Sequence, residues 1–220
     1  MGWWCHPPAR TGAKMSDSTA SMMETRATVY RLLSACYYEP ENCFLEEGVY
    51  TQLRDALNVL NCDLALVAEK MGANFTNVGA EALLQDFSQL FMGPFEIPAK
   101  PYGSVYIDGE NIVMGDSTMA VKACYVEAGF EIAENFRELP DHIAVELEFL
   151  YLLSYRQAEA ISLDDSDALV RYENIEKAFL KNHIGRWLAD FCTKIRQHAQ
   201  TDYYRHLADL TEQLVLSRGD

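Results

Sequence analysis

The chain has 220 residues, enough for one domain with a sizeable hydrophobic core. Apolar residues make up 49% and charged residues 23% of the sequence, which is typical of globular proteins and excludes wholesale disorder. Eighteen Lys and Arg against thirty-three Asp and Glu give a net charge of −15, which disfavours nucleic acid and anionic lipid and favours a basic partner. Because no apolar run approaches the roughly 18 residues of a membrane-spanning helix, we expect no stable membrane insertion.

Residues 1–15 precede the first periodic segment and lack the apolar core and cleavage site of a secretory signal. Met15, Met22 and Met23 are alternative starts of the chain, so the true start codon stays open. We expect residues 1–15 to be disordered or an extension and residues 16–220 to form one all-helical domain. Six cysteines at irregular spacing, with no C-x-x-C, indicate reduced thiols rather than a disulfide framework.

Apolar residues recur at helical spacing along most of the chain. The pattern predicts helices over residues 16–38, 49–60, 64–71, 79–91, 116–129, 140–160, 168–181, 184–197 and 202–217. The helix that starts at Pro140 is apolar on most sides, so we expect it to be central. Short apolar runs at 105–107 and 112–114 flank a turn and predict a short hairpin or an extended pair. The predicted fold is a single all-α globular domain of about nine or ten helices.

One segment differs from its helical surroundings. Residues 91–106 read FMGPFEIPAKPYGSVY, with three prolines, two glycines and four aromatic residues. Prolines fix the backbone, so an ordered loop of this composition loses little conformational entropy. Rigid aromatic side chains suit a surface that binds an apolar segment of another molecule. A loop packed over the domain's own core is the alternative interpretation, and the residues alone do not separate the two.

Metal and nucleophile sites find little support in the sequence. His183, Cys192, His198 and His206 lack the short spacings of metal ligands, and the chain has no G-x-S-x-G elbow and no phosphate-binding P-loop. We therefore expect no metal and no catalytic residue.

An anion or nucleotide site at a helix start is a further candidate. Its residues would be Gly115, Ser117 and Thr118, whose backbone N–H groups could face a phosphate. A plain helix cap is the favoured interpretation of this turn, with Asp116 and Ser117 as the capping residues.

The polar cluster ELPDH, residues 138–142, is the other candidate site. Asp141 in a first helical turn would interact favourably with the helix dipole, and His142 would stay neutral there and act as a hydrogen-bonding group. Glu146 and Glu148 follow within an apolar run, which predicts that at least one of them is partly buried with a partner. A capped helix with one satisfied acid is the favoured interpretation of the spacing alone, ahead of a binding site.

Three segments together resemble a known family, the TorD/DmsD/NarJ-type chaperones that mature molybdenum-containing redox enzymes. They are LLQDFSQLFMGP running into PYGSVYIDGENIVMGDST, then ELPDHIAVELEFLYLL, and finally HIGRWLADFCTKIRQHAQTDYYRHLADL. The resemblance covers the chain from about residue 27 to its end and leans toward the DmsD-like branch. It implies an all-α cytoplasmic protein with no catalytic turnover and no cofactor of its own. Its partner would be the twin-arginine leader peptide of a molybdoenzyme, held until the cofactor is loaded and export can begin.

Carried over by motif, the resemblance implies a leader-binding surface. Its residues would be Phe87, Leu90, Phe91, Pro94, Pro101, Tyr102, Glu138, Asp141 and His142. Relatives often carry tryptophan at the positions of Phe87 and Tyr102. This difference puts in doubt which molybdoenzyme is the client more than it puts in doubt the function. The aromatic loop would hold open an apolar, leader-sized groove beside Asp141 and His142. The alternatives are weak binding of GTP or of the molybdenum cofactor, or a dimeric scaffold, and the protein would be a monomer or a homodimer.

Overall fold

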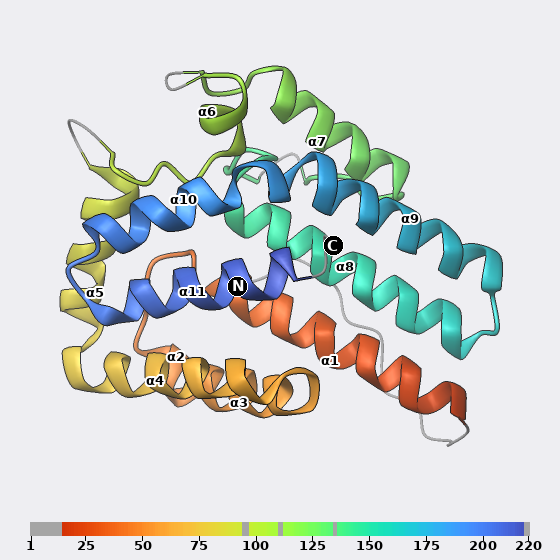
Figure 1. The fold of residues 1–220 in the computed structure, drawn as a ribbon, viewed down its shortest axis with the longest axis horizontal. Helices are drawn as coiled ribbons and strands as arrows, with labels where there is room; N and C mark the ends of the chain where they lie inside the picture. Colours follow the sequence, from red (N-terminus) through yellow and green to blue (C-terminus); the bar gives the residue numbers. More distant parts are fainter. Residues whose placement is uncertain (1–14, 94–96, 110–111, 134–135, 218–220) are drawn as a thin grey trace.

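The computed structural model describes residues 15–93, 97–109, 112–133 and 136–217. These ranges contain eleven α-helices, one π-helix and no strand (Figure 1). The elements are α1 Met15–Ala35, α2 Cys43–Glu46, α3 Val49–Leu60, α4 Cys62–Val78, α5 Ala80–Phe87, η1 Ser88–Met92, α6 Gly103–Ile107, α7 Asp116–Glu127, α8 Ile143–Ser162, α9 Ser166–Asn182, α10 Ile184–His198 and α11 Asp202–Leu216. The all-α fold predicted from the sequence is confirmed.

Helix α8 is the central element, as its apolar character predicts. It packs most extensively against α1 on one side and against α9 on the other. The α3–α4 hairpin packs against α1 and α11, whereas α10 contacts α9, α11 and the short helix α6 (Figure 1). One continuous core therefore joins the first and last helices of the chain.

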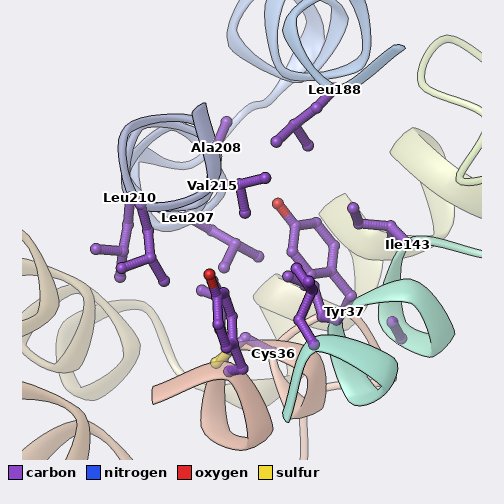
Figure 2. Close-up of a cluster of buried hydrophobic side chains, with 14 of the residues drawn as sticks. Cys36, Tyr37, Ile143, Leu188, Leu207, Ala208, Leu210 and Val215 are labelled. Atoms are coloured by element: carbon purple, nitrogen blue, oxygen red, sulfur yellow. The ribbon is translucent and has the colours of Figure 1, made fainter. Parts of the chain in front are cut away.

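The core is rich in aromatic residues. Trp187, Tyr203 and Phe191 are fully buried. Figure 2 shows Leu207, Leu210 and Val215 of α11 close to the side chains that follow α1, Cys36 and Tyr37. The Tyr37 hydroxyl donates to Thr211 Oγ1 at 2.8 Å, so the polar end of this buried ring is satisfied. These contacts fix the end of α1, which lies beside the candidate site.

A buried polar network ties α1, α8 and α9 together. The Arg26 guanidinium donates to Ser154 Oγ at 3.1 Å and forms an ion pair with Glu176 at 3.3 Å. Gln157 Nε2 also donates to Glu176 Oε2, at 2.8 Å. A buried charge is tolerated only when it is paired and hydrogen-bonded, so this network specifies how the three helices pack.

Two local predictions are wrong. The segment expected to begin a hairpin is helix α6, and residues 112–114 form a bend rather than a strand. Helix α8 begins at Ile143 instead of Pro140, because His142 takes the N-cap position. The predicted helix over 79–91 is confirmed in part, since it changes from α to π geometry at Ser88. Short helix α2 has no periodic signal and was missed.

The turn between α8 and α9 is tight. Asp164 adopts a left-handed φ of 54°, and the Asp165 carboxylate caps α9 by accepting the Ala168 N–H at 2.9 Å. Residues 163–165 therefore form a short capped turn between the two helices. Among the described residues, no helix combines the length and the apolar character needed to cross a membrane.

Candidate leader-binding site

Three of the predicted site residues lie in the core. Phe87, Leu90 and Phe91 are 6%, 1% and 6% exposed. The Phe91 ring contacts Tyr37, Phe191 and Tyr204, with centroid distances of 6.4, 6.1 and 5.7 Å. These three side chains do not line an open groove in this structure, because the apolar stripe of α5 and η1 faces α1, α10 and α11.

The π-helical turn has a clear anchor at its start. The Asp86 carboxylate accepts the backbone N–H groups of Gln200 and Thr201 and the Thr201 hydroxyl, at 2.7–3.1 Å. This carboxylate ties the end of α5 to the turn between α10 and α11. The residues that follow then change to the wider π geometry, a feature often found near functional sites.

The loop after η1 leads directly to the Asp-His cluster. Pro94 lies outside the described residues, and the chain returns with the Ala99 N–H donating to the Leu90 carbonyl at 3.1 Å. Pro101 is buried, and its carbonyl accepts the Ile143 N–H at 2.8 Å. Tyr102 and His142 form an isolated antiparallel bridge. The backbone therefore brings together two segments that are 40 residues apart in the chain.

Asp141 is completely buried and lies before α8 rather than in its first turn. Its Oδ2 accepts the Ser104 N–H of α6 at 2.8 Å, while the Asp141 carbonyl accepts the Gly103 N–H at 2.9 Å. The carboxylate thus stabilises the start of a different helix from the one expected. Because its side chain is inaccessible, Asp141 positions Tyr102 and His142 rather than contacting a ligand in this structure.

His142 caps α8 as a neutral ring. Its Nδ1 accepts the Ala144 N–H at 3.2 Å, and burial lowers the pKa of His142 to about 3. The ring accepts a hydrogen bond as the sequence predicts, although burial, and not the helix dipole, is what lowers its pKa. The ring lies between two tyrosines, stacked on Tyr38 at 6.1 Å and edge-on to Tyr102 at 5.2 Å between centroids.

Two half-buried glutamates flank this aromatic group. The Tyr102 hydroxyl donates to Glu138 Oε2 at 3.2 Å, and the Tyr38 hydroxyl donates to Glu148 Oε1 at 3.4 Å. Burial and the Glu138 charge raise the pKa of Tyr102 to about 12, so the phenol keeps its proton. We call Tyr38, Tyr102, Glu138, His142 and Glu148 the acid–aromatic site. It presents carboxylates and ring edges at one place on the surface.

A second, fully buried acid lies beneath this site. Glu146 is 1% exposed, and its Oε2 accepts the Trp187 indole N–H at 3.4 Å. Burial and the nearby charge of Asp141 raise the pKa of Glu146 well above its ordinary value. The sequence correctly predicted a buried glutamate with a partner at this point. The raised pKa favours the protonated, neutral form of this buried carboxyl group.

The expected anion site at Gly115, Ser117 and Thr118 is occupied by a side chain of the protein. Asp108 Oδ2 accepts the Ser117 N–H at 3.0 Å and the Ser117 hydroxyl at 2.7 Å. Thr118 is buried, and a Cβ at Gly115 would lie only 2.3 Å from the Asp108 carboxylate. The helix start is thus capped, as the favoured interpretation of the sequence held, although by Asp108 instead of Asp116 or Ser117. A phosphate would have to displace this negative charge.

Among the described residues, the cysteines, the possible metal ligands and the pocket between α2, α3 and α4 do not form a second candidate site with the predicted residues. The described cysteines, Cys36, Cys43, Cys62, Cys124 and Cys192, are free thiols. Within the part of the chain that the structure describes, no group of three His, Cys, Asp or Glu side chains could hold a metal ion. A pocket of about 280 Å³ lies between α2, α3 and α4, but it contains none of the predicted site residues.

Sequence reasoning missed part of the acid–aromatic site. Tyr38 follows α1 and Glu148 lies in α8, and they meet only because these two helices pack together. The neighbouring residues Ser104 and Trp187 were also missed as partners of the buried acids. No local pattern marks such pairs, since the partners are 37 to 110 residues apart along the chain.

Comparison with known proteins places the chain in a family. The family model described as "Nitrate reductase delta subunit" matches residues 46–193. A Tat proofreading chaperone DmsD from Salmonella typhimurium is 28% identical over 185 residues, covering 84% of each chain. A chaperone protein TorD from Vibrio parahaemolyticus is 29% identical over 134 residues, or 58% of each chain.

A solved structure shares the fold. It is a proposed redox enzyme maturation protein from Archaeoglobus fulgidus, with a TM-score of 0.55 and 17% identity, and the match covers 96% of this chain and 99% of that one. The family match extends over more than half of the chain and includes α5, η1, α6 and the acid–aromatic residues from Tyr102 to Glu148. The chain therefore belongs to the nitrate reductase delta subunit family, the TorD/DmsD/NarJ-type maturation chaperones that its sequence resembles.

Proposed function

We propose that the protein is a cytoplasmic chaperone that binds the twin-arginine leader of a molybdenum-cofactor-containing oxidoreductase. It would hold the client until the cofactor is loaded and export can begin. Two relatives support this proposal by their names, one a Tat proofreading chaperone and the other a chaperone protein. The net charge of −15 favours association with a basic segment.

The observation that carries the proposal is the chemistry of the acid–aromatic site. Glu138 and Glu148 each accept a tyrosine hydroxyl, and the Tyr102, His142 and Tyr38 rings lie between them. An arginine guanidinium can pair with a carboxylate and stack on an aromatic ring at the same time, which a lysine ammonium does less well. The site is therefore suited to arginine in particular.

The expected energies assign different roles to the two parts of a leader. Each arginine pair with a half-exposed acid contributes about 0–1 kcal/mol, so the arginines set orientation and association rate. Burial of leader apolar surface contributes about 25 cal/mol per Å², and ordering of the peptide cancels much of it. Because the ordering cost offsets much of the gain from burial, we expect micromolar affinity. Phe87 and Phe91 are buried, so they would support the site from beneath instead of contacting the leader.

Calorimetry with synthetic peptides tests the proposal. A twin-arginine leader should bind, and the same peptide with Lys-Lys in place of Arg-Arg and a serine-rich tail should bind at least about tenfold more weakly. Tyr102→Ala should weaken leader binding, whereas Glu46→Gln, on the exposed surface of α2, should not. Equal affinity for the leader and the control peptide would contradict the proposal.

GTP or molybdenum-cofactor binding is a weaker proposal, because Asp108 already caps the helix start that an anion would use. Multiple turnovers of GTP by the pure protein would revive it. Whether the protein is a monomer or a homodimer stays a prediction for sedimentation measurements.

A further inference from the structure

A narrow crevice adjoins the acid–aromatic site on the surface of α8. Four of its residues, Val145, Glu148, Phe149 and Leu152, follow the i, i+3, i+4, i+7 spacing of one helix face. The other wall consists of Tyr125, which lies in α7, and of residues 130–132, which come after that helix. We call this feature the α8 crevice.

The far wall is fixed by a helix-ending motif. Gly129 has a left-handed φ of 82°, the Phe130 N–H donates to the Tyr125 carbonyl at 2.9 Å, and the Gly129 N–H donates to the Val126 carbonyl at 2.9 Å. This is the Schellman arrangement, in which a glycine reverses the chain and returns the next residue to the helix. Phe130 therefore packs edge-on against Phe149, at 6.1 Å between centroids, and Arg156 covers its face at 5.7 Å. The crevice wall is a built feature of the fold.

The chemistry of the crevice is apolar inside and acidic at the edge. Its interior is formed by aromatic rings and aliphatic side chains, whereas Glu131 and Glu148 stand at its rim. The cavity volume is about 30 Å³. A water-sized sphere needs about 10–15 Å³ by the same measure, so the crevice is small, with room for roughly two or three water-sized spheres. This space fits the end of a branched aliphatic side chain and excludes an indole ring.

Glu148 belongs to both features. One of its oxygens accepts the Tyr38 hydroxyl of the acid–aromatic site, and the same side chain forms part of the crevice rim. Tyr125 adds a second link, because its hydroxyl donates to the Pro140 carbonyl next to Asp141. A peptide with arginines at the acid–aromatic site would therefore place its neighbouring residues over the crevice.

We propose that the α8 crevice takes one branched aliphatic side chain from the apolar stretch of the leader, next to the arginines held by the acid–aromatic site. The occupant is argued from the continuity of the two features and from the acidic rim, which complements a basic segment. The proposal rests on the proposed function and adds a rule for choosing clients. Leaders with Leu, Ile or Val at this position are accepted, and leaders with Trp are rejected.

The larger pocket between α2, α3 and α4 fits this occupant less well. It has a volume of about 280 Å³, its lining includes both Arg54 and Glu69, and it shares no residue with the acid–aromatic site. The crevice is small and has acidic residues at its rim, so it is the better match to the chemistry of a leader.

The test combines variants of the protein with variants of the peptide. Leu152→Trp fills the crevice, and Val126→Trp places the same ring on the exposed face of α7, where Val126 is 60% exposed, as a matched control. Each apolar position of a synthetic twin-arginine leader is replaced in turn by alanine. Calorimetry then measures affinity for every combination, and circular dichroism checks that each variant is folded.

We expect Leu152→Trp to weaken leader binding about tenfold, as the loss of one buried aliphatic group predicts, and Val126→Trp to leave it unchanged. One alanine substitution in the leader should weaken binding to the wild-type protein but not to Leu152→Trp, which is the signature of direct contact in a double-mutant cycle. In a second arm, Ile132→Ala enlarges the crevice and should restore binding of a leader with Trp at that position.

Two failures have different meanings. If the wild-type protein binds the leader and the Leu152→Trp and Ile132→Ala variants bind all peptides as it does, the crevice proposal is overturned and the proposed function stands. If the wild-type protein does not distinguish the leader from its Lys-Lys control, both proposals are overturned. Should Leu152→Trp fail to fold, the Ile132→Ala arm decides the question by itself.

Discussion

Two aromatic regions of this protein differ in what their side chains face. Phe87 and Phe91 belong to a closed cluster, in which rings from α5, η1, α10 and α11 contact one another. Tyr38 and Tyr102 lie at the surface, each with its hydroxyl on a glutamate and its ring beside His142. The first region can hold the fold together, and the second can meet a partner.

The difference has a physical origin in the polar end of the ring. A phenylalanine side chain has no group that can hydrogen-bond to water, so it is most stable when completely buried. A tyrosine can be half-buried with its hydroxyl hydrogen-bonded to a carboxylate. The leader-binding residues implied by the family resemblance therefore fall into two groups. Phe87, Leu90 and Phe91 would act through the scaffold, and Tyr102 and Glu138 would act by contact.

The largest effect should come from the closed cluster. Phe91→Ala removes a buried ring that contacts Tyr37, Phe191 and Tyr204, and we expect it to lower the free energy of unfolding by about 3–5 kcal/mol. Urea denaturation measures this loss. Leader affinity of the folded fraction should change little, so a large loss of affinity in a fully folded Phe91→Ala protein would place Phe91 in the contact surface instead.

Asp141 connects the two regions and should show the next largest effect. Asp141→Ala leaves the Ser104 N–H without its partner, which should lower stability by about 1–3 kcal/mol and weaken leader binding by loosening Tyr102. Asp141→Asn keeps an acceptor oxygen of the same shape. If Asn restores leader binding, Asp141 acts by position; if it binds as poorly as Ala, the charge itself is needed.

Glu146 should make stability depend on pH. Its folded-state pKa is raised, so the folded protein holds a proton that the unfolded chain releases above about pH 4.3. The stability that this proton supports is fully present below that pH and is lost as pH rises toward the folded-state pKa. Glu146→Gln cannot ionise, and its amide oxygen can still accept the Trp187 N–H.

Unfolding free energies measured from pH 4 to pH 9 check this prediction. Relative to the variant, the wild-type protein should lose stability steadily with rising pH. Identical pH profiles for the two proteins would mean that Glu146 ionises freely in the folded state.

The smallest effect should come from the exposed edge of the acid–aromatic site. Glu138→Gln removes one half-exposed charge and should weaken leader binding about two- to fivefold at low salt, with the difference shrinking as salt screens the charge. Stability should hardly change. An effect that does not respond to salt would indicate that Glu138 acts through its hydrogen bond to Tyr102 rather than through its charge.

Much of the fold follows from local pattern. The spacing of apolar residues predicts helix α3 over its observed bounds and the ends of α10 and α11 within one residue, because a helix that buries one face must repeat apolar residues at its own period. The spacing of apolar residues does not predict the short helices. Helices α2 and α6 have four and five residues, too few for a period to appear, and α6 depends on a carboxylate from Asp141, 37 residues further along the chain.

The sequence by itself determined the all-α class, the central position of α8 and the net negative charge, because each depends on composition or on the helical period. Only the tertiary structure decided which aromatic residues face the solvent. That choice depends on helices packing across the chain, as when α1 and α8 bring Tyr38 to Glu148 and His142. A ring at the correct helical spacing looks the same in a core and in a binding site until its neighbours are in place.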